Sequence, residues 1–138
     1  MKIPFITFLG ILFAVNIALA DTKQNKNITT CSSAEDCESK SLIEYHSKKN
    51  YAKYIEYQKQ RCYKFEECYT LSTQYYKGEF VKQSYKKAIE LMKPYCYEGR
   101  PVPCETVAYM YEKGDKTLKP DKNKAEIYRR KAAEYSKF

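Results

Sequence analysis

The chain contains few of the residues that metal and redox sites require. Its 138 residues include no tryptophan and a single histidine, His46. A zinc site usually draws on several histidines or on a Cys-x-x-Cys pair, and a redox-active thiol is also typical of Cys-x-x-Cys. The sequence has no Cys-x-x-Cys pair. We therefore expect no metal and no cofactor, and we interpret His46 as an ordinary exposed side chain.

Sustained alternation of apolar and polar residues, the pattern of β-strands, is also missing. Apolar residues recur at helical spacing instead. The expected helices are Glu35–Lys48, Tyr51–Cys62, Glu66–Lys77, Tyr85–Tyr97, Cys104–Lys113 and a last one that follows Asp121. Gly78 and Gly114 are expected to end two of these helices, while Pro101 and Pro103 are interpreted as breaks. The sequence thus predicts an all-α protein.

The apolar stripes of these helices should form the core. The residues expected on the buried faces include Leu42, Ile43, Leu71, Met92, Val107 and Tyr128. The chain also has 15 tyrosines. They suit a helical interface, because the ring fills an apolar seam while the hydroxyl stays in contact with water.

Only one long apolar run is present, and it lies at the N-terminus. Lys2 precedes the apolar stretch Ile3–Leu19, and Ala18-Leu19-Ala20 fits a small-x-small cleavage site. This pattern is typical of a secretory signal peptide, residues 1–20, with cleavage after Ala20. The alternative is an uncleaved anchor, although the stretch is shorter than the roughly 20 residues that span a bilayer. We expect a secreted or periplasmic protein without membrane insertion after cleavage.

Residues 21–30 are polar and lack periodicity, which predicts a disordered leader. Residues 31–138 are long enough for one small domain. After cleavage, 24 Lys and Arg stand against 17 Asp and Glu, a formal charge of +7. An exported protein meets little nucleic acid, so this charge favours acidic partners or anionic surfaces. The alternative is that the lysines form a solvated face.

An internal repeat organises the C-terminal half of the chain. The sequence CYTLSTQYYKG at 68–78 returns 36 positions later as CETVAYMYEKG at 104–114, with six matched positions. A period near 36 is typical of helical-hairpin repeats. Ser84 and Asp121, each four residues before an alanine, are predicted to cap two further helices. We therefore predict an α/α solenoid of antiparallel helical hairpins, each burying its apolar face against its neighbour.

The six cysteines fall into three near pairs, Cys31/Cys37, Cys62/Cys68 and Cys96/Cys104. An even number in an exported chain predicts three disulfides, and sequence proximity favours these pairs among the 15 possible pairings. Residues six apart on a helix rise about 9 Å, whereas a disulfide needs Cα atoms within about 7 Å. The chain must therefore turn within each pair. Each bridge is expected to join the end of one repeat to the start of the next.

The stretch GEFVKQSYKKA at 78–88, running on to Cys96, resembles the Sel-1-like repeat. More closely, it resembles the disulfide-rich secreted branch, the Helicobacter cysteine-rich proteins. The resemblance covers about residues 51–138, and 31–50 only loosely. It implies about two and a half to three helical hairpins in residues 31–138, with a C-x7-C pair bridging successive repeats. Cys96 and Cys104 have that spacing, and the other two pairs are two residues shorter.

The resemblance implies two functions. Sel-1-like repeats resemble tetratricopeptide solenoids and act as protein-interaction scaffolds, so the expected partner is a protein or peptide, with a cell-wall component as an alternative. The cysteine-rich branch is also described as penicillin-binding proteins or weak β-lactamases, which makes a β-lactam the alternative ligand. Ser84 and Lys87 do form Ser-x-x-Lys, but the Ser-Asp-Asn and Lys-Thr-Gly motifs of serine β-lactamases are missing. We predict a binding protein and name no catalytic residue.

Overall fold

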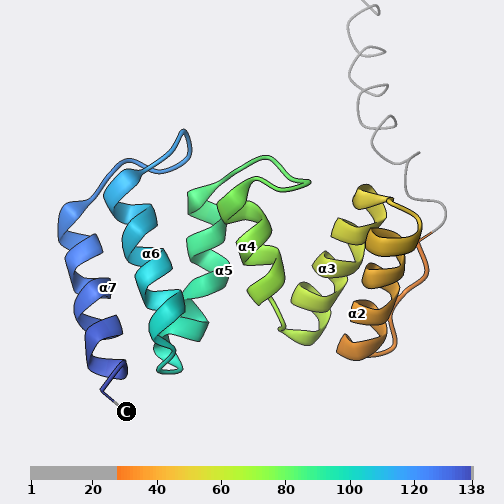
Figure 1. Cartoon of the computed structure of the whole chain (residues 1–138), viewed down its shortest axis with the longest axis horizontal. Helices are drawn as coiled ribbons and strands as arrows, with labels where there is room; N and C mark the ends of the chain where they lie inside the picture. The colour runs from red at the N-terminus through yellow and green to blue at the C-terminus, as the bar shows by residue number, and fades with distance from the viewer. Residues whose placement is uncertain (1–27, 138) are drawn as a thin grey trace, which may run out of the picture.

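Residues 28–137 are the part of the chain that the computed structural model describes, and they form six α-helices (Figure 1). The elements are α2 (Ala34–Leu42), a π-helical turn η1 (Ile43–Ser47), α3 (Tyr51–Phe65), α4 (Tyr69–Lys77), α5 (Tyr85–Tyr97), α6 (Pro101–Lys113) and α7 (Lys122–Tyr135). Within these residues the only strand-like pairing is an isolated bridge between Asp115 and Leu118. The prediction of an all-α protein is therefore confirmed.

The N-terminal predictions fall largely outside the described residues. The expected signal peptide and residues 21–27 of the expected leader belong to the part that is not described. The last residues of that leader lie against α3, where Thr29 Oγ1 is 3.2 Å from the hydroxyl of Tyr57. None of the described helices is both long enough and apolar enough to cross a bilayer.

Consecutive helices pack in pairs, and the pairs lie in a row (Figure 1). The first pair is α2 with α3, the second is α4 with α5, and the third is α6 with α7. The second and third pairs also pack on each other through α5 and α6, whereas α3 and α4 touch less. Figure 1 shows the α4–α5 and α6–α7 loops along one long side of the row and the α3–α4 and α5–α6 junctions along the opposite side.

The second helix of every pair begins with the same side-chain cap. The cap residue accepts a hydrogen bond from the backbone N–H three residues later, which satisfies one of the free donors of the first turn. These bonds are Lys53 to Asn50 (3.2 Å), Lys87 to Ser84 (3.3 Å) and Lys124 to Asp121 (2.9 Å). The caps predicted at Ser84 and Asp121 are confirmed, and Asn50 is a third one.

A backbone hydrogen bond closes each pair at the same place. The N–H of the cap residue donates to a carbonyl near the end of the preceding helix. The acceptors are Glu44 for Asn50 (2.8 Å), Tyr75 for Ser84 (3.0 Å) and Tyr111 for Asp121 (2.6 Å). Glu44, Tyr75 and Tyr111 therefore occupy equivalent positions in the three pairs.

One apolar core runs from Cys62 through the second and third pairs to α7. Leu71, Met92 and Val107 are fully buried in it, and Tyr128 is 6% exposed, as predicted. Gly78 ends α4 in the left-handed conformation, at φ 73°, which glycine adopts at little cost.

The interior of the first pair combines apolar residues such as Cys37, Ile55 and Tyr57 with buried polar ones, and the prediction that Leu42 and Ile43 are buried is wrong. Leu42 and Ile43 are 45% and 50% exposed, whereas Ser41 and Glu44 are buried. The α-helix changes to the π-helical turn directly after Leu42, so residues beyond it no longer follow the 3.6-residue spacing from which the face was predicted. Across the interface, Nε2 of Gln58 donates to Oγ of Ser41 at 2.9 Å.

Two helix boundaries also differ from the predictions. Pro101 and Pro103 lie in the first turn of α6 instead of breaking the chain, because a first-turn residue needs no backbone N–H and the fixed φ of proline suits a helix. Helix α3 continues to Phe65, and Glu66 ends it in the left-handed conformation at φ 64°. Helix α4 therefore begins at Tyr69 and not at Glu66.

The three expected disulfides are present. The Cα–Cα distances are 5.2 Å for Cys31–Cys37, 4.1 Å for Cys62–Cys68 and 4.7 Å for Cys96–Cys104. The last two join α3 to the start of α4 and α5 to α6, at the junctions between pairs.

The expectation that every bridge joins successive repeats is wrong for the first disulfide. Cys31 precedes α2 and Cys37 lies within it, so this bridge closes a turn inside the first pair. Cys31 also contacts α3, because its N–H donates to Oε1 of Gln60 at 2.9 Å and its carbonyl accepts from Nζ of Lys64 at 2.7 Å. The disulfide therefore fastens the start of the described chain to α2, and the two hydrogen bonds fasten it to α3.

Candidate functional site

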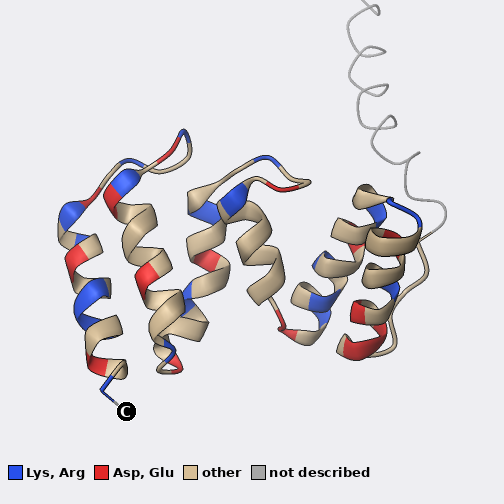
Figure 2. Ribbon diagram, viewed as in Figure 1, with Lys and Arg blue, Asp and Glu red and all other residues tan. Residues whose placement is uncertain are grey.

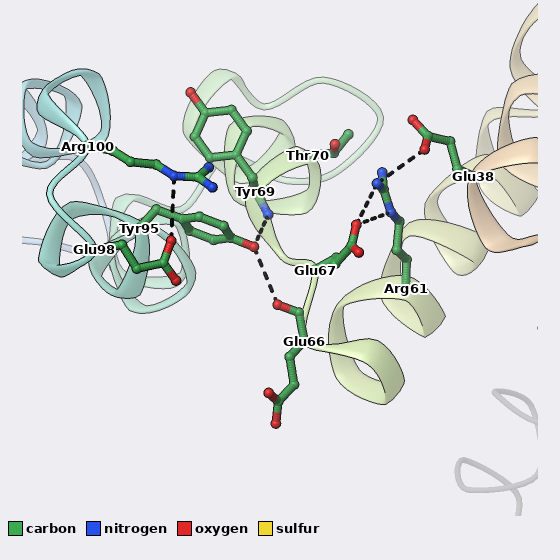
Figure 3. Close-up of a pocket in the computed structure, with 9 residues that line it drawn as sticks. All are labelled: Glu38, Arg61, Glu66, Glu67, Tyr69, Thr70, Tyr95, Glu98 and Arg100. Atoms are coloured by element: carbon green, nitrogen blue, oxygen red, sulfur yellow. Dashed lines mark hydrogen bonds and ion pairs between the residues drawn. The ribbon is translucent and has the colours of Figure 1, made fainter. Parts of the chain in front are cut away.

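A cavity of about 590 Å³ opens where the first and second pairs meet (Figure 3). We call it the junction cavity. Its lining comes from α2, α3, α4, α5 and the turns between them and comprises Glu38, Arg61, Glu66, Glu67, Tyr69, Thr70, Tyr95, Glu98 and Arg100. The cavity adjoins the Cys62–Cys68 bridge, since its lining includes Arg61 next to Cys62, and Glu67 and Tyr69 on either side of Cys68.

The hydroxyl of Tyr95 caps helix α4 from across the junction cavity (Figure 3). It accepts hydrogen bonds from the N–H groups of Cys68 at 2.7 Å and Tyr69 at 3.1 Å. It is also 3.4 Å from the carbonyl of Glu66, to which it donates. Because the cap residue Cys68 provides no side-chain acceptor, Tyr95 supplies the missing one. Tyr95 thus has a structural role.

The two guanidinium groups of the junction cavity are already engaged. Arg61 bridges Glu38 and Glu67, at 3.2 and 2.6 Å. Arg100 pairs with Glu98 at 3.5 Å and lies 5.1 Å from the centre of the Tyr95 ring. The ion pairs of Arg61 therefore connect α2, α3 and the α3–α4 turn at the junction cavity.

Two further pockets are built around the equivalent tyrosines Tyr75 and Tyr111, and we call them the tyrosine–lysine pockets. The first measures about 370 Å³ and is lined by Lys59, Tyr75, Val81, Lys82, Gln83, Ser84, Lys87 and Thr117. The second measures about 450 Å³ and is lined by Lys86, Ile89, Glu90, Lys93, Tyr111 and Leu118. Both draw lining residues from α5.

Each pocket tyrosine is covered by the lysine that follows the cap of its own pair by three residues; Lys87 lines its pocket, whereas Lys124 is not part of the lining of the second one. Nζ of Lys87 is 5.1 Å from the centre of the Tyr75 ring, and Nζ of Lys124 is 5.5 Å from that of Tyr111. These are cation–π distances. The same contact thus recurs in the second and third pairs.

A second lysine approaches each tyrosine from the preceding pair, nine residues after that pair's cap. In the second pocket this is Lys93, at 5.9 Å from the centre of the Tyr111 ring. In the first pocket it is Lys59, which lines the pocket together with Tyr75. Burial tends to lower the pKa of Lys59, but the hydrogen bond and ion pair with Glu56 outweigh it and raise that pKa. Lys59 therefore stays protonated at neutral pH.

The start of α5 is closed by its own cap and by the α6–α7 loop. The N–H of Tyr85 donates to Oδ2 of Asp115 at 2.8 Å, and the N–H of Lys86 donates to Oγ1 of Thr117 at 3.2 Å. With the bonds of Ser84 and Lys87 described above, the first four N–H groups are all satisfied. Burial acts to raise the pKa of Asp115, but hydrogen bonds from Tyr85 and Thr117 prevail and lower it.

Ser84, the first residue of the Ser-x-x-Lys sequence, is part of this closed helix start. It is buried, its Oγ accepts from the N–H of Lys87, and its hydroxyl donates to Thr117 at 3.2 Å. The ammonium of Lys87 lies over the Tyr75 ring. Ser84 is thus engaged as a helix cap, the structural role that its sequence position also predicts.

The remaining predicted site residues are placed as follows. His46 is exposed, and its ring meets the Tyr45 ring edge to face at 4.8 Å. All six cysteines are bonded, and the described residues hold no group of histidine, cysteine and acidic side chains arranged for a metal ion. Comparisons with known protein families, with curated proteins and with solved structures find no match for this chain.

Proposed function

We propose that this chain is a secreted or periplasmic Sel-1-like repeat protein, an α/α solenoid cross-linked by disulfides, that binds another protein or a peptide. The observation that carries the proposal is the recurrence of one pocket plan in successive helix pairs. Repeat proteins use such recurring surfaces to bind extended partners, because each repeat presents equivalent side chains in a row.

Two further features support the proposal. The helix caps and the backbone hydrogen bonds of the cap residues recur in all three pairs, as expected for repeated helical hairpins. The three disulfides suit an oxidising compartment, since such bonds persist outside the cytosol. Together with the apolar N-terminal run, they favour export.

The alternative, a penicillin-binding protein or weak β-lactamase, rests on Ser84 and Lys87. Both side chains have other partners, in the cap of α5 and at the Tyr75 ring. We therefore propose the binding function and expect purified residues 21–138 to leave a chromogenic cephalosporin intact at high protein concentration. Turnover that disappears in Ser84→Ala would favour the enzyme instead.

The binding function is tested by selecting ligands for oxidised, purified residues 21–138 from a random displayed peptide library. We expect enriched peptides, and we expect the double variant Lys87→Glu/Lys93→Glu to bind them at least tenfold more weakly. The matched control is Lys119→Glu/Lys137→Glu, which makes the same change of charge at two exposed lysines outside both pockets. If no peptide is enriched, or if only the control variant loses binding, the proposed function is wrong.

A further inference from the structure

We infer that the partner is an acidic peptide and that the two tyrosine–lysine pockets receive two of its carboxylate side chains. This inference rests on the proposed function and adds the chemistry of the ligand. Figure 2 shows the background for it, with basic residues at the starts of α5 and α7 and acidic residues at the α3–α4 junction. Basic helix starts thus lie on the side of the row that carries the α4–α5 and α6–α7 loops, and the acidic α3–α4 junction lies on the opposite side.

The first pocket has the composition of an anion site. Lys59, Lys82 and Lys87 line it, together with three residues that carry a hydroxyl group and no carboxylate. Lys82 and Lys87 are exposed, and neither forms an ion pair within residues 28–137. Lys59 is paired with Glu56 at 2.6 Å, so two of the three ammonium groups can take a new counter-ion.

The cation–π contact prepares Lys87 for a carboxylate. An ammonium group has three N–H donors, and a ring face attracts the charge without being a strong hydrogen-bond acceptor. The Tyr75 ring therefore restrains the position of the ammonium, and its donors remain available for carboxylate oxygens. A lysine held in place loses less conformational entropy on binding than a freely moving one.

The apolar parts of both pockets favour a peptide over a phosphate-rich polymer. Val81 lines the first pocket, and Ile89 and Leu118 line the second. A glutamate side chain has methylene groups that can pack against these apolar residues. A phosphate group has none, so it would place charged oxygens against the apolar lining. Volumes of about 370 and 450 Å³ suit single side chains better than a folded domain.

The second pocket repeats the site in a weaker form. Lys93 is 5.9 and 6.0 Å from the ring centres of Tyr111 and Tyr128, and Lys86 lines the same pocket. Glu90 is also part of its lining and opposes an incoming carboxylate. We therefore expect the first pocket to contribute more affinity than the second. Because α5 lines both, a peptide that crosses α5 can reach both.

The first helix pair offers no third site. Glu44 occupies the position of Tyr75 and Tyr111, and its own carboxylate accepts from Nζ of Lys48 at 2.8 Å. The pair thus contains a carboxylate where the other pairs have a tyrosine and lysines. We therefore expect two acidic residues of the ligand to contribute to the affinity, and a third one to add little affinity.

The test measures binding of three octapeptides to oxidised residues 21–138 by fluorescence polarisation at 150 mM salt. One peptide has glutamate at alternate positions, and the others have glutamine or lysine there. We expect the glutamate peptide to bind and the glutamine peptide to bind at least tenfold more weakly. Lys87→Gln should weaken the glutamate peptide about tenfold, and Lys93→Gln about threefold. Lys119→Gln/Lys137→Gln should change it less than twofold.

Several outcomes would overturn the inference. Equal losses in the pocket variants and in the Lys119/Lys137 control would show diffuse charge attraction instead of two sites. Tighter binding of polyphosphate than of the glutamate peptide at equal charge would assign the pockets to an anionic polymer. Library selections that enrich peptides without acidic residues would refute the inference and leave the binding function standing, whereas selections that enrich nothing would refute both. Melting temperatures of the variants confirm that each is folded.

Discussion

The first helix pair and the two that follow share one backbone plan and differ in their interiors. The cap and the closing hydrogen bond recur in all three. The later pairs enclose one large apolar core, whereas the first combines a small apolar cluster around Cys37 and Tyr57 with the buried polar residues Ser41, Glu44 and Gln58. Oε2 of Glu44 and Oε1 of Gln58 are buried without a hydrogen-bond partner, and so is Oε1 of Gln74 in the second pair. The same backbone plan thus accommodates both interiors, and the more polar one leaves the weaker pattern in the sequence.

The contacts between neighbouring pairs differ in the opposite direction. The loop of the third pair reaches the start of α5 through the carboxylate of Asp115. The loop of the second pair reaches the start of α3 through Phe80, whose ring stacks on Tyr51 with centres 4.2 Å apart and an angle of 13°. Phe80 has φ 62°, a conformation that bulky residues rarely adopt. An aromatic contact therefore replaces a polar one at the equivalent place.

The largest expected effect concerns the apolar core. Leu71→Ala should lower the free energy of unfolding by about 3 kcal/mol, because a fully buried leucine leaves a cavity. Leu42→Ala is the matched control in the first pair, where the side chain is 45% exposed, and it should cost less than about 0.5 kcal/mol. Urea denaturation measures both. Equal losses would mean that Leu42 is packed as tightly as Leu71.

The second largest effect is expected from removing single disulfides, one in the first pair and one at the junction with the second pair. Removing Cys62–Cys68 or Cys31–Cys37 by double alanine substitution should cost about 2.2 kcal/mol each, from the entropy of a loop closed over six residues. The location of the loss should differ. Hydrogen exchange is expected to rise at the α3–α4 junction for the first variant and in α2 for the second. The same exchange pattern in both variants would contradict independent roles for the two bridges.

The free energy of unfolding of the later pairs should fall at low pH, because Asp115 becomes protonated there. Its pKa in the folded protein is lowered from the usual 3.8, so its carboxylate stabilises the fold above that pH. This contribution disappears as the pH falls through the lowered pKa. Asp115→Asn should remove about 1 kcal/mol at pH 7 and flatten the acid limb of the stability curve. Glu79→Gln, at the equivalent position of the preceding loop, should do neither. An unchanged acid limb in Asp115→Asn would contradict the assignment.

The smallest change in the free energy of unfolding is expected when a buried polar contact of the first pair is replaced by apolar residues. Ser41→Ala/Gln58→Leu removes a buried hydrogen bond and also the unpartnered Oε1 of Gln58. Replacing both partners by apolar groups should change the free energy of unfolding by less than about 1 kcal/mol, toward higher stability. Gln58→Leu alone leaves Ser41 without its donor and is expected to be less stable than the double variant. A loss above about 2 kcal/mol in the double variant would show that the polar interior is needed.

The later pairs could be predicted from the sequence because their physics is local and repeated. The matched cysteine, tyrosine and glycine positions at an offset of 36 identify the hairpins, and Ser84 and Asp121 identify their second helices. Pro101 was misread because a proline favours a helix start as readily as a break, and only the tertiary structure decides between them. The buried face of α2 could not be read, because it consists of the small residues Ala34, Cys37 and Ser41 and includes no large apolar side chain.

The tyrosine–lysine pockets were only partly predictable. The sequence shows that tyrosine and lysine recur together, and the cap predicts where Lys87 and Lys124 lie on their helices. Lys59 and Lys93 were missed as members of the same pockets, because each comes from the pair before. The signal that identifies them is their shared distance of nine residues from the caps Asn50 and Ser84. That signal becomes visible only once Asn50 is recognised as a cap.

The closure of α5 by Asp115 and Thr117 sets an order in time. Both acceptors lie about 30 residues after the N–H groups that they satisfy. Because the chain is synthesised from its N-terminus, the N–H groups of Tyr85 and Lys86 have no side-chain acceptor until residues 115 and 117 are available. The short disulfide loops, of six and eight residues, can close well before that point. Oxidation should accordingly precede the completion of the helix row, and a reducing pulse during folding should lower the yield of folded protein more than the same pulse given afterwards.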